Sequence, residues 1–137
     1  MIPTQLQLAL VPEPAAVGRA RRALAPCLVA WGLPAPLRDD LLLVLSELVT
    51  NAVRHALDDR DLALTVVCLD DELVVTVRDH VPALPVQRRA APDAESGRGM
   101  TLVAAVSSRW WVERTPGGKC VSVALTRRTA DEAVRAS

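Results

Sequence analysis

The chain contains no phenylalanine and no tyrosine, and tryptophan occurs only three times among its 137 residues. Half of the residues are nevertheless hydrophobic, so the core must be aliphatic, built from leucine, valine and alanine with a few tryptophans. This amount of sequence fits one domain and leaves no room for a second. No apolar stretch reaches the roughly 18–20 residues that a membrane-spanning helix needs, and no signal peptide is legible. We therefore expect a cytoplasmic protein that has no membrane partner.

An excess of either charge is absent as well. Lys+Arg and Asp+Glu both number 16, which gives a formal net charge of zero. Such a chain lacks the basic field that drives nucleic-acid binding, so direct contact with DNA or RNA is not expected. No CxxC motif occurs, and Cys27, Cys68 and Cys120 lie in separate apolar runs. That placement is typical of small buried hydrophobic residues rather than thiolate metal ligands. No Ser-His-Asp or Cys-His arrangement is legible either.

Hydrophobic periodicity predicts an α+β fold. Strands are expected at Gln5–Val11, Leu62–Leu69, Glu72–Asp79, Arg109–Arg114 and Lys119–Thr126, and helices at Ala15–Trp31, Leu37–Leu57 and Gly97–Ser108. Because Pro26 lies within the first helical pattern, a kink or two shorter helices are expected there. Hairpins that cluster, instead of alternating with helices, favour a two-layer α/β sandwich with a mixed, mostly antiparallel sheet and its helices on one face.

Two segments have no periodicity. Residues 80–96 contain three prolines and mixed charges, which is typical of a long functional or disordered loop. Residues 127–137 are polar and are expected to form a C-terminal tail. The single domain is therefore expected to span residues 1–126.

The helix expected at Leu37–Leu57 carries the most informative residues. On a helical wheel its apolar residues form one arc, and Glu47 and Asn51 lie together beside that arc, four residues apart. At the margin of a buried face, a carboxamide oxygen suits Mg²⁺, and a carboxylate can activate a nucleophile. Taken alone, such a pair is also common on solvent-facing helix surfaces. The apolar arc consists of Leu41, Leu42, Leu45, Leu48, Val49, Ala52, Val53 and Ala56.

The run from Ser46 to Ala56, which reads SELVTNAVRHA, resembles the N-box of the GHKL ATPases. Among these it is most similar to the small bacterial anti-sigma-factor serine kinases and their stand-alone relatives. The resemblance covers nearly the whole chain and implies the family's α/β sandwich. It also implies ATP and Mg²⁺ as cofactors, with Glu47 as the general base and Asn51 as the magnesium ligand.

Two further segments match the family in order. Asp79 stands where the first glycine box begins, which implies that it accepts a hydrogen bond from the adenine amino group. Val81 and Ala83 occupy the positions where glycines are expected, although glycine is the residue that allows a tight turn there. The second glycine box resembles Gly97-Arg98-Gly99-Met100, whose backbone N–H groups, at the start of a helix, would face phosphates. Without the resemblance, Asp79 merely ends a strand and this second segment is an ordinary helix start.

Three functions follow as hypotheses. The first is an ATP-dependent anti-sigma factor that phosphorylates a serine or threonine of its antagonist protein and binds a sigma factor as a homodimer. The second is a degenerate GHKL domain that binds a partner and has weak or no ATP binding, as the residues at 81 and 83 suggest. The third, the ATPase half of a split sensor histidine kinase, is less favoured because no dimerisation helix with a phospho-accepting histidine is present.

Overall fold

The structure is a computed structural model that describes residues 4–82 and 95–127, with only the backbone described for residues 95–99. Most of the expected loop at residues 80–96, including Ala83, and the expected tail beyond Arg127 lie outside the described residues. The elements are β1 (Gln5–Leu10), α1 (Ala15–Ala30), α2 (Ala35–His55), β2 (Leu62–Cys68), β3 (Glu72–Asp79), α3 (Glu95–Val106), β4 (Arg109–Thr115) and β5 (Gly118–Thr126). This order confirms the predicted succession of strands and helices.

The five strands form one sheet in the order β1-β2-β3-β5-β4. Every pair of neighbouring strands in it is antiparallel, which confirms and sharpens the expectation of a mostly antiparallel sheet. β5 lies between β3 and β4, and its register with β3 pairs Asp79 with Lys119. The C-terminal end of β3 therefore lies beside the N-terminal end of β5.

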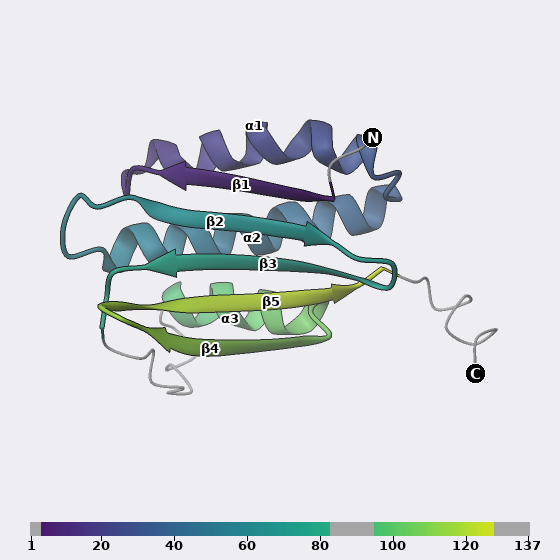
Figure 1. The fold of residues 1–137 in the computed structure, drawn as a ribbon. Helices are drawn as coiled ribbons and strands as arrows, with labels where there is room; N and C mark the ends of the chain where they lie inside the picture. Colours follow the sequence, from purple (N-terminus) through teal and green to yellow (C-terminus); the bar gives the residue numbers. More distant parts are fainter. Residues whose placement is uncertain (1–3, 83–94, 128–137) are drawn as a thin grey trace.

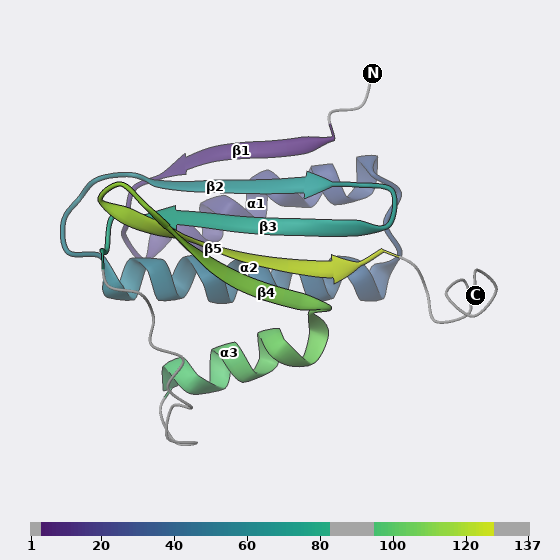
Figure 2. The same cartoon turned by 60° about the horizontal axis from the view of Figure 1, so that its bottom comes forward.

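The helices α1, α2 and α3 cover one face of the sheet, as predicted (Figures 1 and 2). Along β2 and β3, every second residue is buried, and these residues alternate with half-buried or exposed ones on the opposite face. The buried core between the layers is aliphatic apart from Trp31 and Cys68, as the composition requires. Its largest fully buried side chains are Leu10, Leu24, Leu28, Leu41, Leu45, Leu62, Leu64, Leu73, Leu125, Val44, Val49 and Val66.

Pro26 does not divide α1, which runs as one helix from Ala15 to Ala30, so the alternative of two shorter helices was wrong. Proline removes only one backbone N–H donor, and here it lies on the exposed side of the helix. The opposite side is pinned to the core by residues at i, i+4, i+8 and i+12, which keep both halves aligned. These buried residues are Ala16, Ala20, Leu24 and Leu28.

The helix α2 begins at Ala35, two residues before the expected start, with Pro34 as its N-cap and Pro36 in its first turn. Proline is compatible with this position because the first N–H groups of a helix have no intrahelical partner. The helix ends at His55 rather than Leu57, because Ala56 is extended. Leu57, predicted as the last helical residue, is exposed.

The helix α3 begins at Glu95 and ends at Val106, so it starts two residues before Gly97 and ends two residues before Ser108, the expected bounds. The hairpin between β4 and β5 turns at Pro116 and Gly117, and Gly117 adopts a positive φ of 76°. This is the geometry of a tight turn with proline first and glycine second. A tight turn therefore joins β4 to β5.

The start of β1 and the end of β5 lie at the end of the sheet opposite the C-terminal end of β3 (Figure 1). Thr4 accepts a hydrogen bond from the backbone of Cys68 at 2.8 Å, and the Arg127 N–H donates to the carbonyl of Asp71 at 2.9 Å. The Arg127 side chain also donates to the carbonyls of Leu69 and Trp31. Among the described residues, no helix is long and apolar enough to cross a membrane.

Candidate functional site

The segments with the predicted site residues gather at one end of the molecule. The C-terminal half of α2, the end of β3 and the start of α3 all lie there, on the left in both views (Figures 1 and 2). α2 packs against β3, β5 and α3. Three segments that are distant in sequence and contain the predicted site residues thus lie at the same end of the fold.

Glu47 and Asn51 lie on one face of α2, and both are half-buried. Leu48 and Ala52, the next residues after each of them, are buried in the core, which confirms the predicted apolar arc. Within the described part of the chain, no hydrogen bond or ion pair engages the side chain of Glu47 or Asn51. The two oxygen-bearing groups therefore remain free to bind something else.

The turn of α2 just before Glu47 is held by a side chain from α1. Arg21 donates from Nη1 to Ser46 Oγ at 2.7 Å and to the Leu42 carbonyl at 3.3 Å. Ser46 Oγ itself donates to the Leu42 carbonyl at 2.7 Å. This small network ties α1 to α2 and fixes the turn from which Glu47 projects.

Asp79 ends β3 on the face that the helices cover, and it is only 4% exposed. Its Oδ2 forms an ion pair with Lys119 Nζ at 2.7 Å, and its Oδ1 accepts the backbone N–H of Val81 at 2.9 Å. Lys119 is also buried, with a side chain that is 8% exposed. The carboxylate predicted to bind adenine thus already has a cation and a backbone donor as partners.

Gly118 permits this pairing. A Cβ at that position would overlap the carbonyl oxygen of Asp79 and lie 3.0 Å from the Cα of His80. Only glycine therefore lets β5 begin this close to the end of β3. Its position in turn sets Lys119 beside Asp79.

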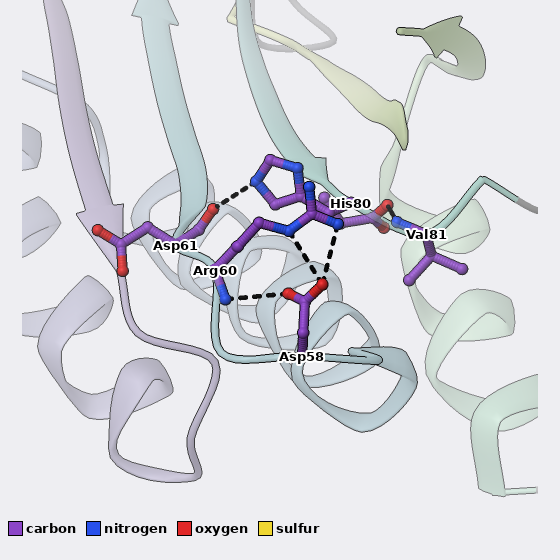
Figure 3. Close-up of polar contacts among 6 residues, drawn as sticks. Asp58, Arg60, Asp61, His80 and Val81 are labelled. Atoms are coloured by element: carbon purple, nitrogen blue, oxygen red, sulfur yellow. Dashed lines mark hydrogen bonds and ion pairs between the residues drawn. The ribbon is translucent and has the colours of Figure 1, made fainter. Parts of the chain in front are cut away.

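The loop after α2 is fastened to the end of β3 (Figure 3). Arg60 donates to the Asp58 carboxylate from its side chain and its backbone, and these hydrogen bonds lower the pKa of that carboxyl from its ordinary value. His80 Nε2 lies 3.1 Å from the carbonyl oxygen of Asp61. Asp79, His80 and Val81 line a shallow hollow on this side of the strand end, together with residues 56–58, 60 and 62. Neither Glu47 nor Asn51 lines that hollow.

The glycine-rich segment forms the first turns of α3 rather than a separate loop before it. The backbone of Gly97, Arg98 and Gly99 is helical, and their side-chain environment lies outside the described residues. Met100 is half-buried and packs against the hydrophobic core. The first N–H groups of α3, from Glu95 onward, lack intrahelical partners, as in every helix.

A family model described as the histidine kinase-like ATPase domain matches residues 10–125. The chain belongs to this family. The membership confirms the resemblance to the GHKL proteins, and the α/β sandwich with its antiparallel sheet confirms the predicted fold class. A comparison with curated protein sequences finds no match.

Several solved structures have a similar fold. One contains the RsbU and RsbW domains of Rv1364c from Mycobacterium tuberculosis, with a TM-score of 0.70, 19% identity, and coverage of 91% of this chain and 33% of that one. Another is the histidine kinase domain of a blue-light activated kinase from Erythrobacter litoralis, with a TM-score of 0.56, 22% identity, and coverage of 82% and 60%. The histidine kinase AdeS of Acinetobacter baumannii gives a TM-score of 0.54, 13% identity, and coverage of 90% and 68%. The chain thus spans about a third of the first of these proteins.

Asp79 was identified from the sequence, whereas the roles of Gly118 and Lys119 were not. A signal was present, because Lys119 alternates with Val121 and Val123 and therefore shares their inward face. A charged residue at an inward position of a strand requires a partner. The partner itself was not evident, since Asp79 lies 40 positions away in a strand whose register the sequence does not specify.

Proposed function

We propose that this chain is a nucleotide-dependent regulatory protein, an anti-sigma factor that uses ATP and Mg²⁺ to phosphorylate a serine or threonine of its antagonist. Residues 1–126 would act as one ATP-binding domain. The observation that carries the proposal is the pair formed by Glu47 and Asn51, which is half-buried, without partners in the described chain, and located in α2 of a histidine kinase-like ATPase domain.

The donor set suits magnesium. No group of three or more His, Cys, Asp or Glu side chains among the described residues forms a protein cage for a metal ion. Mg²⁺ rarely needs one, since it keeps several waters and shares substrate phosphates with one or two protein oxygens. Asn51 would supply such an oxygen through its side-chain amide. When bound, Mg²⁺-ATP supplies the phosphoryl group and neutralises part of its charge.

The remaining residues have distinct roles in this proposal. Glu47 would accept the proton of the substrate hydroxyl, because its carboxylate lies one helical turn from Asn51. The unpaired backbone N–H groups in the first turn of α3, including those of Gly97 and Arg98, would receive phosphate oxygens, and the Arg98 side chain would add positive charge. Gly99 and Met100 would continue the same helix beside the phosphates. Asp79 would accept a hydrogen bond from the adenine amino group. Catalysis would otherwise depend on positioning and charge stabilisation.

The partners are proposed on the family resemblance and on the fold shared with the structure that contains the RsbW domain of Rv1364c. We propose a sigma factor and its antagonist as protein partners, and a homodimer as the working form. These partners are cytoplasmic proteins, so the same proposal places the chain in the cytoplasm.

Calorimetric titration of the purified protein with ATP, with and without Mg²⁺, tests the binding step. We expect Mg²⁺-dependent binding in the parent and its loss in Asn51→Ala, with unchanged unfolding because Asn51 lies outside the buried arc. Asp39→Ala is the matched control, since Asp39 is exposed near the other end of α2. An Asn51→Ala variant that binds Mg²⁺-ATP like the parent would remove Asn51 as a ligand.

Phosphotransfer is tested separately with γ-labelled ATP and a candidate antagonist. Glu47→Ala should retain ATP binding and lose transfer to the antagonist serine or threonine. If the label is transferred at the parent rate, Glu47 is not the general base.

One observation favours a second candidate, a degenerate domain that binds partners with little or no nucleotide. The Asp79 carboxylate is already paired with Lys119, and Val81 occupies a position where the family has glycine. The two candidates differ in thermal stability, since ligand at about 100 times its Kd adds about 2.7 kcal/mol. An unchanged melting temperature at millimolar Mg²⁺-ATP would favour the second candidate.

A further inference from the structure

The ion pair between Asp79 and Lys119 is the part of this end of the fold that the proposed chemistry leaves unexplained. Both side chains are more than nine-tenths buried, on the face of the sheet that carries the aliphatic core. Removal of two charges from water costs several kcal/mol for each ion, and apolar residues of similar size often serve the fold equally well. A purely structural reason for this pair is therefore weak.

The hydrogen-bonding capacity of the pair is only partly used. An ammonium group has three donors, and Lys119 Nζ directs one of them to Asp79. A carboxylate has about four acceptor positions, and the described chain fills two of those on Asp79, from Lys119 and from the Val81 N–H. Each member of the pair has at least one partner, as buried polar groups almost always do, and further donor and acceptor positions remain. The pair thus presents a donor beside an acceptor, 2.7 Å apart, at the end of the fold where the site residues gather.

We infer that Lys119 is a base-reading residue of the nucleotide site. Asp79 accepts a hydrogen bond from the exocyclic amino group of adenine, and Lys119 donates one to a ring nitrogen beside that amino group. A purine edge carries such a donor and acceptor side by side, which matches an acceptor and a donor held 2.7 Å apart. This inference rests on the proposed function, because it assigns a second residue to the same site.

The backbone supports this role. The absence of a Cβ at Gly118 lets β5 start against the end of β3, so that Lys119 emerges at the level of Asp79. The Val81 N–H fixes Oδ1, and the lysine fixes Oδ2, so the carboxylate is held in one orientation before any base arrives. Preorganised donors and acceptors of this kind give affinity because little ordering remains to be done on binding.

The test combines a protein variant with nucleotide analogues. The dissociation constants of ATP, 1-deaza-ATP and 7-deaza-ATP are measured by calorimetry with Mg²⁺, for the parent and for Lys119→Met, whose side chain has a similar length and no charge. In the two analogues a carbon replaces one or the other ring nitrogen beside the amino group. We expect Lys119→Met to bind ATP roughly tenfold to hundredfold more weakly, as for the loss of a charge-assisted hydrogen bond. One of the two analogues should bind the parent more weakly than ATP does, by a similar factor. The affinity of Lys119→Met for that analogue should be no lower than the parent's affinity for it.

The other outcomes separate the proposals. If both analogues bind the parent like ATP, or if Lys119→Met binds ATP as well as or better than the parent, Lys119 does not read the base. A merely structural ion pair would lower the stability of Lys119→Met without making the parent sensitive to either analogue. If Lys119→Met does not fold, the analogue comparison on the parent decides alone. Failure of the parent to bind any of the three nucleotides would remove the proposed function together with this inference.

Discussion

Removal of one partner from the ion pair between Asp79 and Lys119 should strongly destabilise the fold. In Lys119→Met, the Asp79 carboxylate keeps its Val81 N–H bond and loses its counter-ion while it remains 5% exposed. An uncompensated buried charge of this kind costs about 3–5 kcal/mol. Because small domains are stable by only about 5–15 kcal/mol, the variant should fold but with a much smaller free energy of unfolding.

The assay is urea unfolding at neutral pH, followed by tryptophan fluorescence. With a slope of about 2 kcal/mol/M, a loss of about 4 kcal/mol lowers the unfolding midpoint by about 2 M. Asp79→Asn, which keeps an acceptor for the Val81 N–H, should also destabilise, because the ammonium of Lys119 then lacks a charged partner. In the double variant both charges are gone, so its loss should be smaller than the sum of the two single losses by more than 1 kcal/mol.

Additivity would refute this reasoning. If the double variant loses the sum of the two single losses within about 0.5 kcal/mol, the two groups do not interact energetically. The same conclusion follows if Lys119→Met loses less than about 1 kcal/mol, the value of an exposed pair.

Three further predictions concern the glycines and the cysteines. Gly118→Ala should lower the free energy of unfolding by about 1–3 kcal/mol or more in urea titrations, because its Cβ meets the backbone of Asp79; a stability equal to the parent's would show that β5 can shift at no cost. Gly18→Ala in α1 is the matched control and should stabilise by up to about 1 kcal/mol, since its Cβ meets only the flexible end of Arg22; marked destabilisation there would contradict the packing described for α1. Burial raises the pKa of the Cys68 and Cys120 thiols. In a Cys27→Ser variant, alkylation of these two thiols should therefore be slow at neutral pH and accelerate only above the ordinary thiol pKa of about 8.5. Fast labelling at pH 7 would contradict this.

The elements of the fold were largely predictable, because their signals are local. The long helix α2 has about five turns of uninterrupted apolar periodicity, and strands β2 and β3 alternate clearly. The boundaries were less predictable where proline is involved. Pro36 lies inside the first turn of α2, where a missing N–H costs little. Pro26 lies inside α1, where proline is unfavourable, and the buried side of the helix outweighs that cost.

The candidate site was likewise predictable only where its geometry is local. Glu47 and Asn51 lie four residues apart, so their common face follows from helical geometry alone. The neighbour of Asp79 does not follow from any local rule, because it depends on which strand pairs with β3 and in which register. Only the assembled sheet places a lysine from β5 against that carboxylate.

The placement of Thr4 and Arg127 has a practical consequence for fusion proteins that contain this domain. β1 starts and β5 ends at the end of the sheet opposite the C-terminal end of β3, which holds Asp79 (Figure 1). An affinity tag, a fluorescent protein or a second domain joined before Thr4 or after Arg127 would therefore start at the end of the sheet opposite the expected ligand site. Multidomain architectures that place such a module between others would meet the same favourable geometry.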